Sequence, residues 1–99
     1  MREKCIEIQL RNEARKRGGL CLKWVSPGTK GVPDRIIIWP GGRIHFIEVK
    51  TKAGVLSGSQ QHIFCELINH RADVFIIRGM DDVSRYMKKI DEDLKDDEL

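Results

Sequence analysis

The sequence lacks any apolar run long enough to cross a membrane, and its longest stretches, such as Ile36-Ile37-Ile38-Trp39, cover only a few positions. A transmembrane helix needs about 20 consecutive apolar residues. The first residues, Met-Arg-Glu-Lys-Cys, lead into amphipathic sequence, whereas a signal peptide continues into an apolar core. We therefore expect a protein without a membrane partner that works in the cytoplasm.

Cysteines are also scarce, and the three present (Cys5, Cys21 and Cys65) are odd in number and far apart. The sequence contains no C-x-x-C pair, and its histidines do not have the spacing of zinc ligands. This pattern favours reduced thiols over disulfides or a structural zinc site. Because each cysteine has apolar neighbours, we expect all three to be buried as small hydrophobic residues.

Aromatic residues make up only 6% of the chain, and no aromatic-rich surface is apparent, so stacking of single-stranded bases is not suggested. The remaining composition is 40% hydrophobic and 33% charged, which is typical of a globular protein. A length of 99 residues leaves room for one domain with a modest core.

The net charge of +3 conceals an uneven distribution of charge along the chain. Residues 91–99 hold six acids and one base, whereas residues 1–90 hold 17 bases and 9 acids, a net charge of +8. A body this basic suits nucleic acid, although a solubilising surface is the alternative. We expect the acidic end to be disordered and solubilising. A second hypothesis is that it competes with nucleic acid for the basic face.

The hydrophobic periodicity predicts a helix over residues 3–17, strands over 20–25, 34–39 and 43–50, a helix over 58–71, a strand over 73–78 and a last helix over 80–90. This order, α-β-β-β-α-β-α, indicates one α/β domain over residues 1–90, followed by the acidic tail 91–99. We expect a mixed central sheet flanked by helices, because a helical crossover joins parallel strands.

The register of the central hairpin brings two acids together. Proline cannot donate to a ladder, so the loop is predicted to be Pro40-Gly41-Gly42. Counting back along both strands then places Asp34 opposite Glu48, and Lys50 shares the face of Glu48. A two-residue loop would shift the register by one position and move Asp34 to the other face.

Two opposed carboxylates have Cβ atoms about 5 Å apart, a pairing that destabilises a sheet unless a cation lies between them. Such hard oxygen ligands suit Mg²⁺ or Mn²⁺ rather than zinc. The ion would polarise a phosphodiester and lower the pKa of an attacking water. Lys50 would orient that water or offset charge in the transition state. The alternative is a surface salt bridge between Glu48 and Lys50, because a bare D…E-x-K pattern occurs in many unrelated chains.

These residues carry a resemblance to a known family. Gly31-Val32-Pro33-Asp34, followed after thirteen residues by Glu48-Val49-Lys50, resembles the PD-(D/E)xK nuclease superfamily. The details are most similar to its VRR-NUC family, because Glu7 lies on the first helix and Leu56-Ser57-x-x-Gln60 opens the second. The resemblance covers about residues 3–79 and implies a restriction-endonuclease-like fold.

The resemblance also implies roles for individual residues. Asp34 and Glu48 would bind the metal together with the backbone carbonyl of Val49. Lys50 would be the catalytic lysine. Glu7 would lie near the metal and act directly or through a water, and Gln60 would point toward the site from the second helix.

Several of these residues also have simpler interpretations. Ser57-x-x-Gln60 is a capping box, which alone explains the pair, and Glu7 suits a solvated helix face. Gly31 would allow the backbone to approach a ligand closely, or it would serve an ordinary turn. Basic residues around the site would contact phosphates or would simply be solvated charges. They are Lys23, Lys30, Arg35 and Lys52.

The resemblance implies a Mg²⁺- or Mn²⁺-dependent DNA endonuclease, with no small-molecule cofactor, in a bacterial or phage-infected host cytoplasm. Stand-alone, phage-sized family members resemble Holliday junction resolvases that act as homodimers, so we expect a homodimer that prefers four-way branched DNA. One alternative is a weakly catalytic or non-catalytic DNA-binding module. Others are a simple nicking nuclease without junction preference, and a nuclease directed at RNA.

Overall fold

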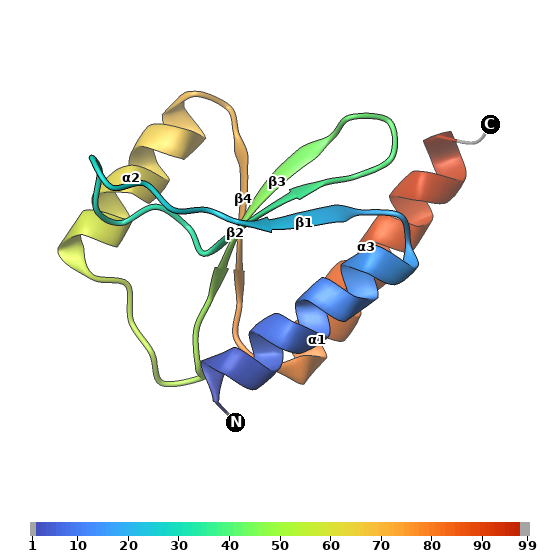
Figure 1. Cartoon of the computed structure of the whole chain (residues 1–99), viewed down its shortest axis with the longest axis horizontal. Coiled ribbons are helices and arrows are strands. Elements are labelled where there is room, and N and C mark those ends of the chain that lie inside the picture. Colours follow the sequence, from blue (N-terminus) through green and yellow to red (C-terminus); the bar gives the residue numbers. More distant parts are fainter. Residues whose placement is uncertain (1, 98–99) are drawn as a thin grey trace.

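The computed structural model describes residues 2–97, which form three helices and four strands (Figure 1). In chain order these elements are α1 (Glu3–Lys16), β1 (Leu20–Lys23), β2 (Arg35–Ile38), β3 (Ile44–Val49), α2 (Gly58–Asn69), β4 (Asp73–Ile77) and α3 (Met80–Asp97). The predicted order α-β-β-β-α-β-α is confirmed. Within the described part of the chain, no helix is both long enough and apolar enough to cross a membrane.

The four strands form one mixed sheet in the order β1-β2-β3-β4. β1, β2 and β3 are antiparallel neighbours, whereas β4 pairs parallel to β3, as expected for two strands joined through a helix. Helices α1 and α3 pack together along one face of the sheet, and α2 lies on the opposite side, against β4 (Figure 1). The sheet is therefore the middle layer of the domain.

The β2–β3 hairpin has the predicted register. The Trp39 amide donates to the Arg43 carbonyl at 2.8 Å, which closes the three-residue loop over residues 40–42. Both glycines of this loop have φ near +95°, a conformation that favours glycine. When the pairing continues one residue beyond the start of β2, Asp34 stands opposite Glu48 as predicted.

The core lies between the sheet and the pair α1–α3. The apolar stripe of α1, Ile6, Leu10 and Ala14, is fully buried there. A trio of polar side chains is buried beside it, because Trp39 Nε1 donates to Tyr86 Oη at 3.1 Å and to His45 Nδ1 at 3.2 Å. Burial lowers the pKa of His45, which favours the neutral form of its ring. The trio ties the β2–β3 hairpin to α3.

Only one cysteine follows the expectation of burial. Cys21 is buried, whereas Cys5 and Cys65 are exposed, so the prediction was wrong for two of the three thiols. Both exposed thiols lie on helices directly beside buried residues, Ile6 and Phe64. Consecutive helical residues point about 100° apart, and an apolar neighbour in sequence therefore says little about burial on a helix.

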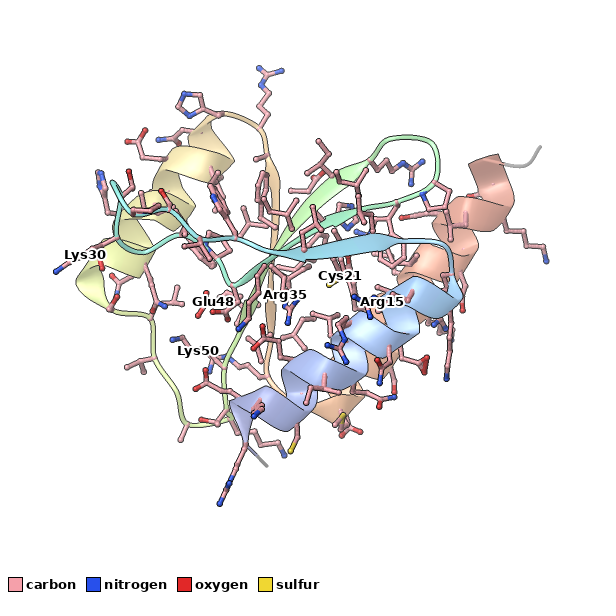
Figure 2. The ribbon with its side chains drawn as sticks, in the orientation of Figure 1. Arg15, Cys21, Lys30, Arg35, Glu48 and Lys50 are labelled. Carbon is pink, nitrogen blue, oxygen red and sulfur yellow. The ribbon has the colours of Figure 1, made fainter. Side chains whose placement is uncertain are left out.

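The prediction that the acidic end is disordered is wrong for residues 91–97, because α3 continues to Asp97. Leu94 follows Ile90 by one helical turn and packs against the same core. Arg17 Nε also lies 2.6 Å from the Asp91 carboxylate and ties this stretch to the end of α1. Residues 98 and 99 lie outside the described part. The end of α3 is far from Glu48 and Lys50, which does not favour competition with a ligand there (Figures 1 and 2).

Candidate active site

The proposed site begins with a row of residues across the sheet. The Trp24 amide donates to the Asp34 carbonyl at 3.0 Å, which extends the β1–β2 pairing to this row. Continuing both registers gives the order Trp24, Asp34, Glu48, and directly opposed residues share one face. Hydrogen-bonded pairs alternate along a hairpin, so Asp34 and Glu48 form one of the narrow pairs, with Cα atoms about 4.5 Å apart.

Glu48 is a buried carboxylate with one free oxygen. The residue is 1% exposed, and its Oε2 accepts from Lys50 Nζ at 3.2 Å and from Gln60 Nε2 at 3.1 Å. Its Oε1 is buried and has no hydrogen-bond partner within the described residues. Burial raises the pKa of Glu48, the charge of Asp34 raises it further, and Lys50 opposes both effects. Glu48 Oε1 is therefore a site that a cation would stabilise.

Asp34 is partly buried, and its Oδ2 accepts from the Val49 amide at 2.8 Å. Burial raises the pKa of Asp34, the Val49 N–H lowers it, and the charges of Glu7 and Glu3 raise it again. Sequence reasoning did not identify Glu3. Glu3 lies four residues before Glu7 on the same face of α1, and this spacing could have identified it. Two glutamates of α1 thus lie close enough for their charges to act on Asp34.

The carbonyl and the amide of Val49 both point from β3 toward β2. In a strand, the N–H and C=O of one residue point to the same neighbour, so this carbonyl is directed toward the side of Asp34. The continued register places Pro33 opposite Val49, and proline has no N–H to donate. Pro33 therefore offers no N–H to the Val49 carbonyl, and the next residue, Asp34, places a carboxylate beside that carbonyl.

These oxygens fit a hard divalent cation. Residues 2–97 contain no group of three or more His, Cys, Asp and Glu side chains that would hold a metal. An ion bound at this site would take Asp34, Glu48 and the Val49 carbonyl as its protein ligands, with water or phosphate as the others. That donor set is typical of Mg²⁺, which keeps several waters and relies on one or two carboxylates. The free Oε1 of Glu48 supports this fit.

Glu7 and Arg35 are paired with each other. Their Oε1 and Nε atoms are 2.7 Å apart, and the Arg35 side chain is only 11% exposed. Arg35 follows Asp34 in sequence, so it points to the opposite face of the sheet, beneath α1 (Figure 2). This placement contradicts the expectation that Arg35 contacts phosphates. Arg35 instead holds Glu7, whose charge reaches Asp34.

Gln60 satisfies both interpretations made from the sequence. Its Oε1 accepts from the Ser57 amide at 2.9 Å, and the Ser57 hydroxyl accepts from the Gln60 amide at 3.2 Å, which completes a capping box. Its Nε2 donates to Glu48 Oε2. Because the cap occupies the amide oxygen, the amide NH₂ is left to face Glu48.

Gly31 serves α2 rather than a ligand. Its φ is +91°, and a Cβ at this position would lie 2.3 Å from the Ser59 carbonyl oxygen. The close approach expected from the sequence is therefore made to the first turn of α2, which carries Gln60. Gly31 lets the loop before Asp34 lie directly on the helix that contacts Glu48.

The other basic candidates remain at the surface. Lys23, Lys30 and Lys52 are exposed, and Lys30 lies on the loop beside the start of α2 (Figure 2). Lys50 differs from them, because its side chain is 14% exposed and pairs with Glu48. The site thus has one enclosed lysine, with Lys30 and Lys52 solvated near it in sequence, whereas Lys23 is the register partner of Arg35 on the other face of the sheet.

Comparison with known proteins agrees with this arrangement. Residues 4–81 match the family model of the VRR-NUC domain. The chain belongs to the VRR-NUC family. A solved structure described as a VRR_NUC domain superposes with a TM-score of 0.72 and 26% identity, covering 83% of this chain and 94% of that one. The family match includes every residue of the site described above except Glu3.

A relative from a phage gives a further match. "Putative nuclease p44" of Acyrthosiphon pisum secondary endosymbiont phage 1 is 52% identical over 50 residues, which cover 50% of this chain. The same residues cover 54% of that protein, so the match spans about half of its length.

Replacing Asp34 by Asn should stabilise the metal-free protein near pH 7–8 by about 1 kcal/mol. Asn still accepts from the Val49 amide but removes the charge beside Glu48. Because the folded state raises the pKa of Asp34, this group favours folding at low pH, and that contribution is lost as the pH rises through the folded pKa. The gain should therefore shrink toward pH 4. Thermal unfolding in chelator at several pH values measures it, and an unchanged midpoint at pH 8 would contradict the proposed strain.

Gly31→Ala should destabilise the protein by about 1–3 kcal/mol, because the new Cβ would collide with backbone and occupy an unfavourable φ. Gly28→Ala is the matched control on the same loop, since its Cβ would meet nothing within 4 Å. Urea unfolding of both variants measures the difference. Equal effects of the two substitutions would show that Gly31 does not position α2.

Proposed function

We propose that this protein is a Mg²⁺- or Mn²⁺-dependent endonuclease that hydrolyses phosphodiester bonds in DNA. The observation that carries the proposal is the narrow pairing of Asp34 with Glu48, in which a buried carboxylate oxygen has no hydrogen-bond partner among residues 2–97. A surface salt bridge does not explain this geometry, because Glu48 is 1% exposed and retains a free oxygen. Membership of the VRR-NUC family supports the same chemistry.

The bound metal would supply Lewis acidity to the phosphodiester and would lower the pKa of the attacking water. The protein residues arrange what surrounds it. Gln60 and Lys50 both hold Oε2 of Glu48, which leaves Oε1 as the free ligand atom. The Lys50 ammonium lies at the same site, where it orients the water and offsets negative charge in the transition state.

DNA is the proposed polyanion because the body of the chain is basic and exposed lysines lie near the site in sequence. Lys30 precedes Asp34 by four residues, and Lys52 follows Lys50 by two. Contacts of this kind bind the phosphate backbone without reading sequence, and they weaken with added salt. The substrate would therefore be selected by its shape.

The finer proposal is a homodimer that prefers four-way branched DNA. Symmetric cutting of a four-way junction needs two active sites at a fixed spacing, which a two-fold dimer provides. An open part of the sheet supports a self-contact, since Leu20, Leu22 and Ile44 are 54%, 43% and 46% exposed on one face. β1 is also an edge strand, and natural proteins cover or blunt such edges.

Glu48→Ala and Lys50→Ala should each reduce metal-dependent cleavage by about 100-fold or more while DNA binding persists. The measurement is cleavage of labelled four-way, flap, duplex and single-stranded DNA with Mg²⁺, Mn²⁺ or chelator. Lys16→Ala is the control, because Lys16 is a solvated lysine on α1 paired with Glu13. Cleavage that survives both substitutions would exclude this site. Binding without any cleavage by the unmodified protein would favour a DNA-binding module.

The dimer proposal predicts a mass of twice 11.4 kDa by light scattering. Leu22→Glu should convert the dimer to a monomer, because it places a charge on the open apolar face. Paired cuts across the junction should then disappear, while nicking of single strands persists. An unmodified protein that is monomeric both free and on junction DNA would refute the dimer and leave a simple nicking nuclease.

A further inference from the structure

A pocket of about 280 Å³ lies between the loop after β1 and helix α2, outside the set of residues that would hold the metal. Its walls are apolar, and its rim carries groups able to form hydrogen bonds. The residues that define it are Trp24, Thr29, Ile63, Glu66, Leu67 and His70.

The pocket adjoins the proposed active site through both of its walls. Trp24 stands in the row of Asp34 and Glu48, so strand spacing puts its Cα about 5 Å from that of Asp34 and about 10 Å from that of Glu48. On α2, Ile63 lies one turn after Gln60, roughly 5 Å along the helix. A nucleotide whose phosphate lies between the two carboxylates would therefore have a neighbouring base within reach of the pocket.

The chemistry of the pocket suits a flat aromatic ring with polar edges. Trp24 is partly exposed and provides an aromatic surface, while Ile63 and Leu67 form the aliphatic side opposite it. Glu66 would accept from the amino group of a base, and the Thr29 hydroxyl both donates and accepts. The volume lies at the small end for ligand pockets and suits one base rather than a base pair.

Charge around the pocket fits the same occupant. Lys30 follows Thr29 on the loop that forms the pocket wall. It is exposed, so it can meet a phosphate beside an inserted base. The sequence did not suggest base stacking, because no cluster of aromatic residues is apparent in it. One tryptophan is sufficient when a distant helix forms the opposite wall.

We infer that this pocket binds an unstacked base of the DNA substrate next to the phosphodiester that is cut. The inference rests on the proposed nuclease function and adds a source of selectivity to it. A continuous duplex keeps its bases stacked, and extracting one costs a few kcal/mol. Branch points and single strands present unstacked bases at lower cost, so the pocket would favour them within each protomer, independently of any dimer.

The test uses a single-stranded oligonucleotide and a four-way junction that carry 2-aminopurine, a fluorescent base, at successive positions. With chelator present no cleavage occurs, so binding is measured alone. The fluorescence should change on binding at one or two adjacent positions only. Trp24→Leu, which keeps an apolar contact to Phe46, should remove that change and weaken binding of the single strand about fivefold or more.

Ile63→Phe is the second variant, since it narrows the pocket from α2 while leaving Trp24 in place. It should also remove the position-specific signal. Val25→Ala is the matched control, because Val25 is 76% exposed on the same loop and does not line the pocket. Circular dichroism establishes that each variant is folded. A signal that persists in both pocket variants, or that is equal at every probe position, would overturn the inference.

The two proposals fail in different ways. If the nuclease proposal is wrong, cleavage is absent or insensitive to Glu48→Ala, whatever the fluorescent base reports. If only the pocket proposal is wrong, cleavage depends on Glu48 but the probe signal does not depend on Trp24. A signal that also appears with 2-aminopurine riboside alone would show that the pocket takes a free nucleoside, which contradicts a role confined to the DNA chain.

Discussion

The repulsion between Asp34 and Glu48 is the constraint on which the rest of the site depends. The two acids occupy a narrow pair of the β2–β3 ladder, and burial raises the pKa of both. A sheet selected only for stability would place an apolar pair here, because unpaired buried charge is unfavourable. The pairing makes sense when a divalent cation supplies the missing charge. Stability of the isolated chain is then lower than it would otherwise be, and binding of the proposed metal would offset the difference.

The residues around this pair limit its movement without neutralising it. Pro33 removes a backbone donor beside the Val49 carbonyl, and the Val49 amide holds Asp34. Gly31 allows α2 to approach so closely that Gln60, fixed by its own capping box, reaches Glu48. Each contact leaves Oε1 of Glu48 unoccupied for the proposed metal. The free oxygen of Glu48 is thus a consequence of where the surrounding donors are placed, rather than an accident of packing.

Much of this could be predicted from the sequence, since the decisive features are local. Pro40 determined the hairpin loop, and the loop determined which face Asp34 occupies. The failures came from properties that depend on tertiary contacts. The charge of residues 91–97 suggested disorder, but Leu94 and the Arg17–Asp91 pair hold them in a helix. Arg35 was expected to contact phosphates because it is basic and close to Asp34 in sequence. The expectation ignored that consecutive strand residues point to opposite faces of the sheet. Glu3 and the Trp24 pocket escaped notice, because each acquires its role through a segment distant in sequence.

The proposed base pocket and the proposed metal site lie side by side on one face of the sheet. Strand pairing determines which residues of each are neighbours. One row across the sheet contains Trp24 on the edge-strand side, then Asp34, then Glu48. The same backbone hydrogen bonds therefore position the aromatic surface and the proposed metal ligands. α2 contributes to both regions, because Gln60 donates to Glu48 and Ile63 lines the pocket together with Trp24. A displacement of α2 would therefore disturb the carboxylate and the base pocket together. In the proposed nuclease, α2 would couple substrate shape to catalysis, because the same helix contacts both regions.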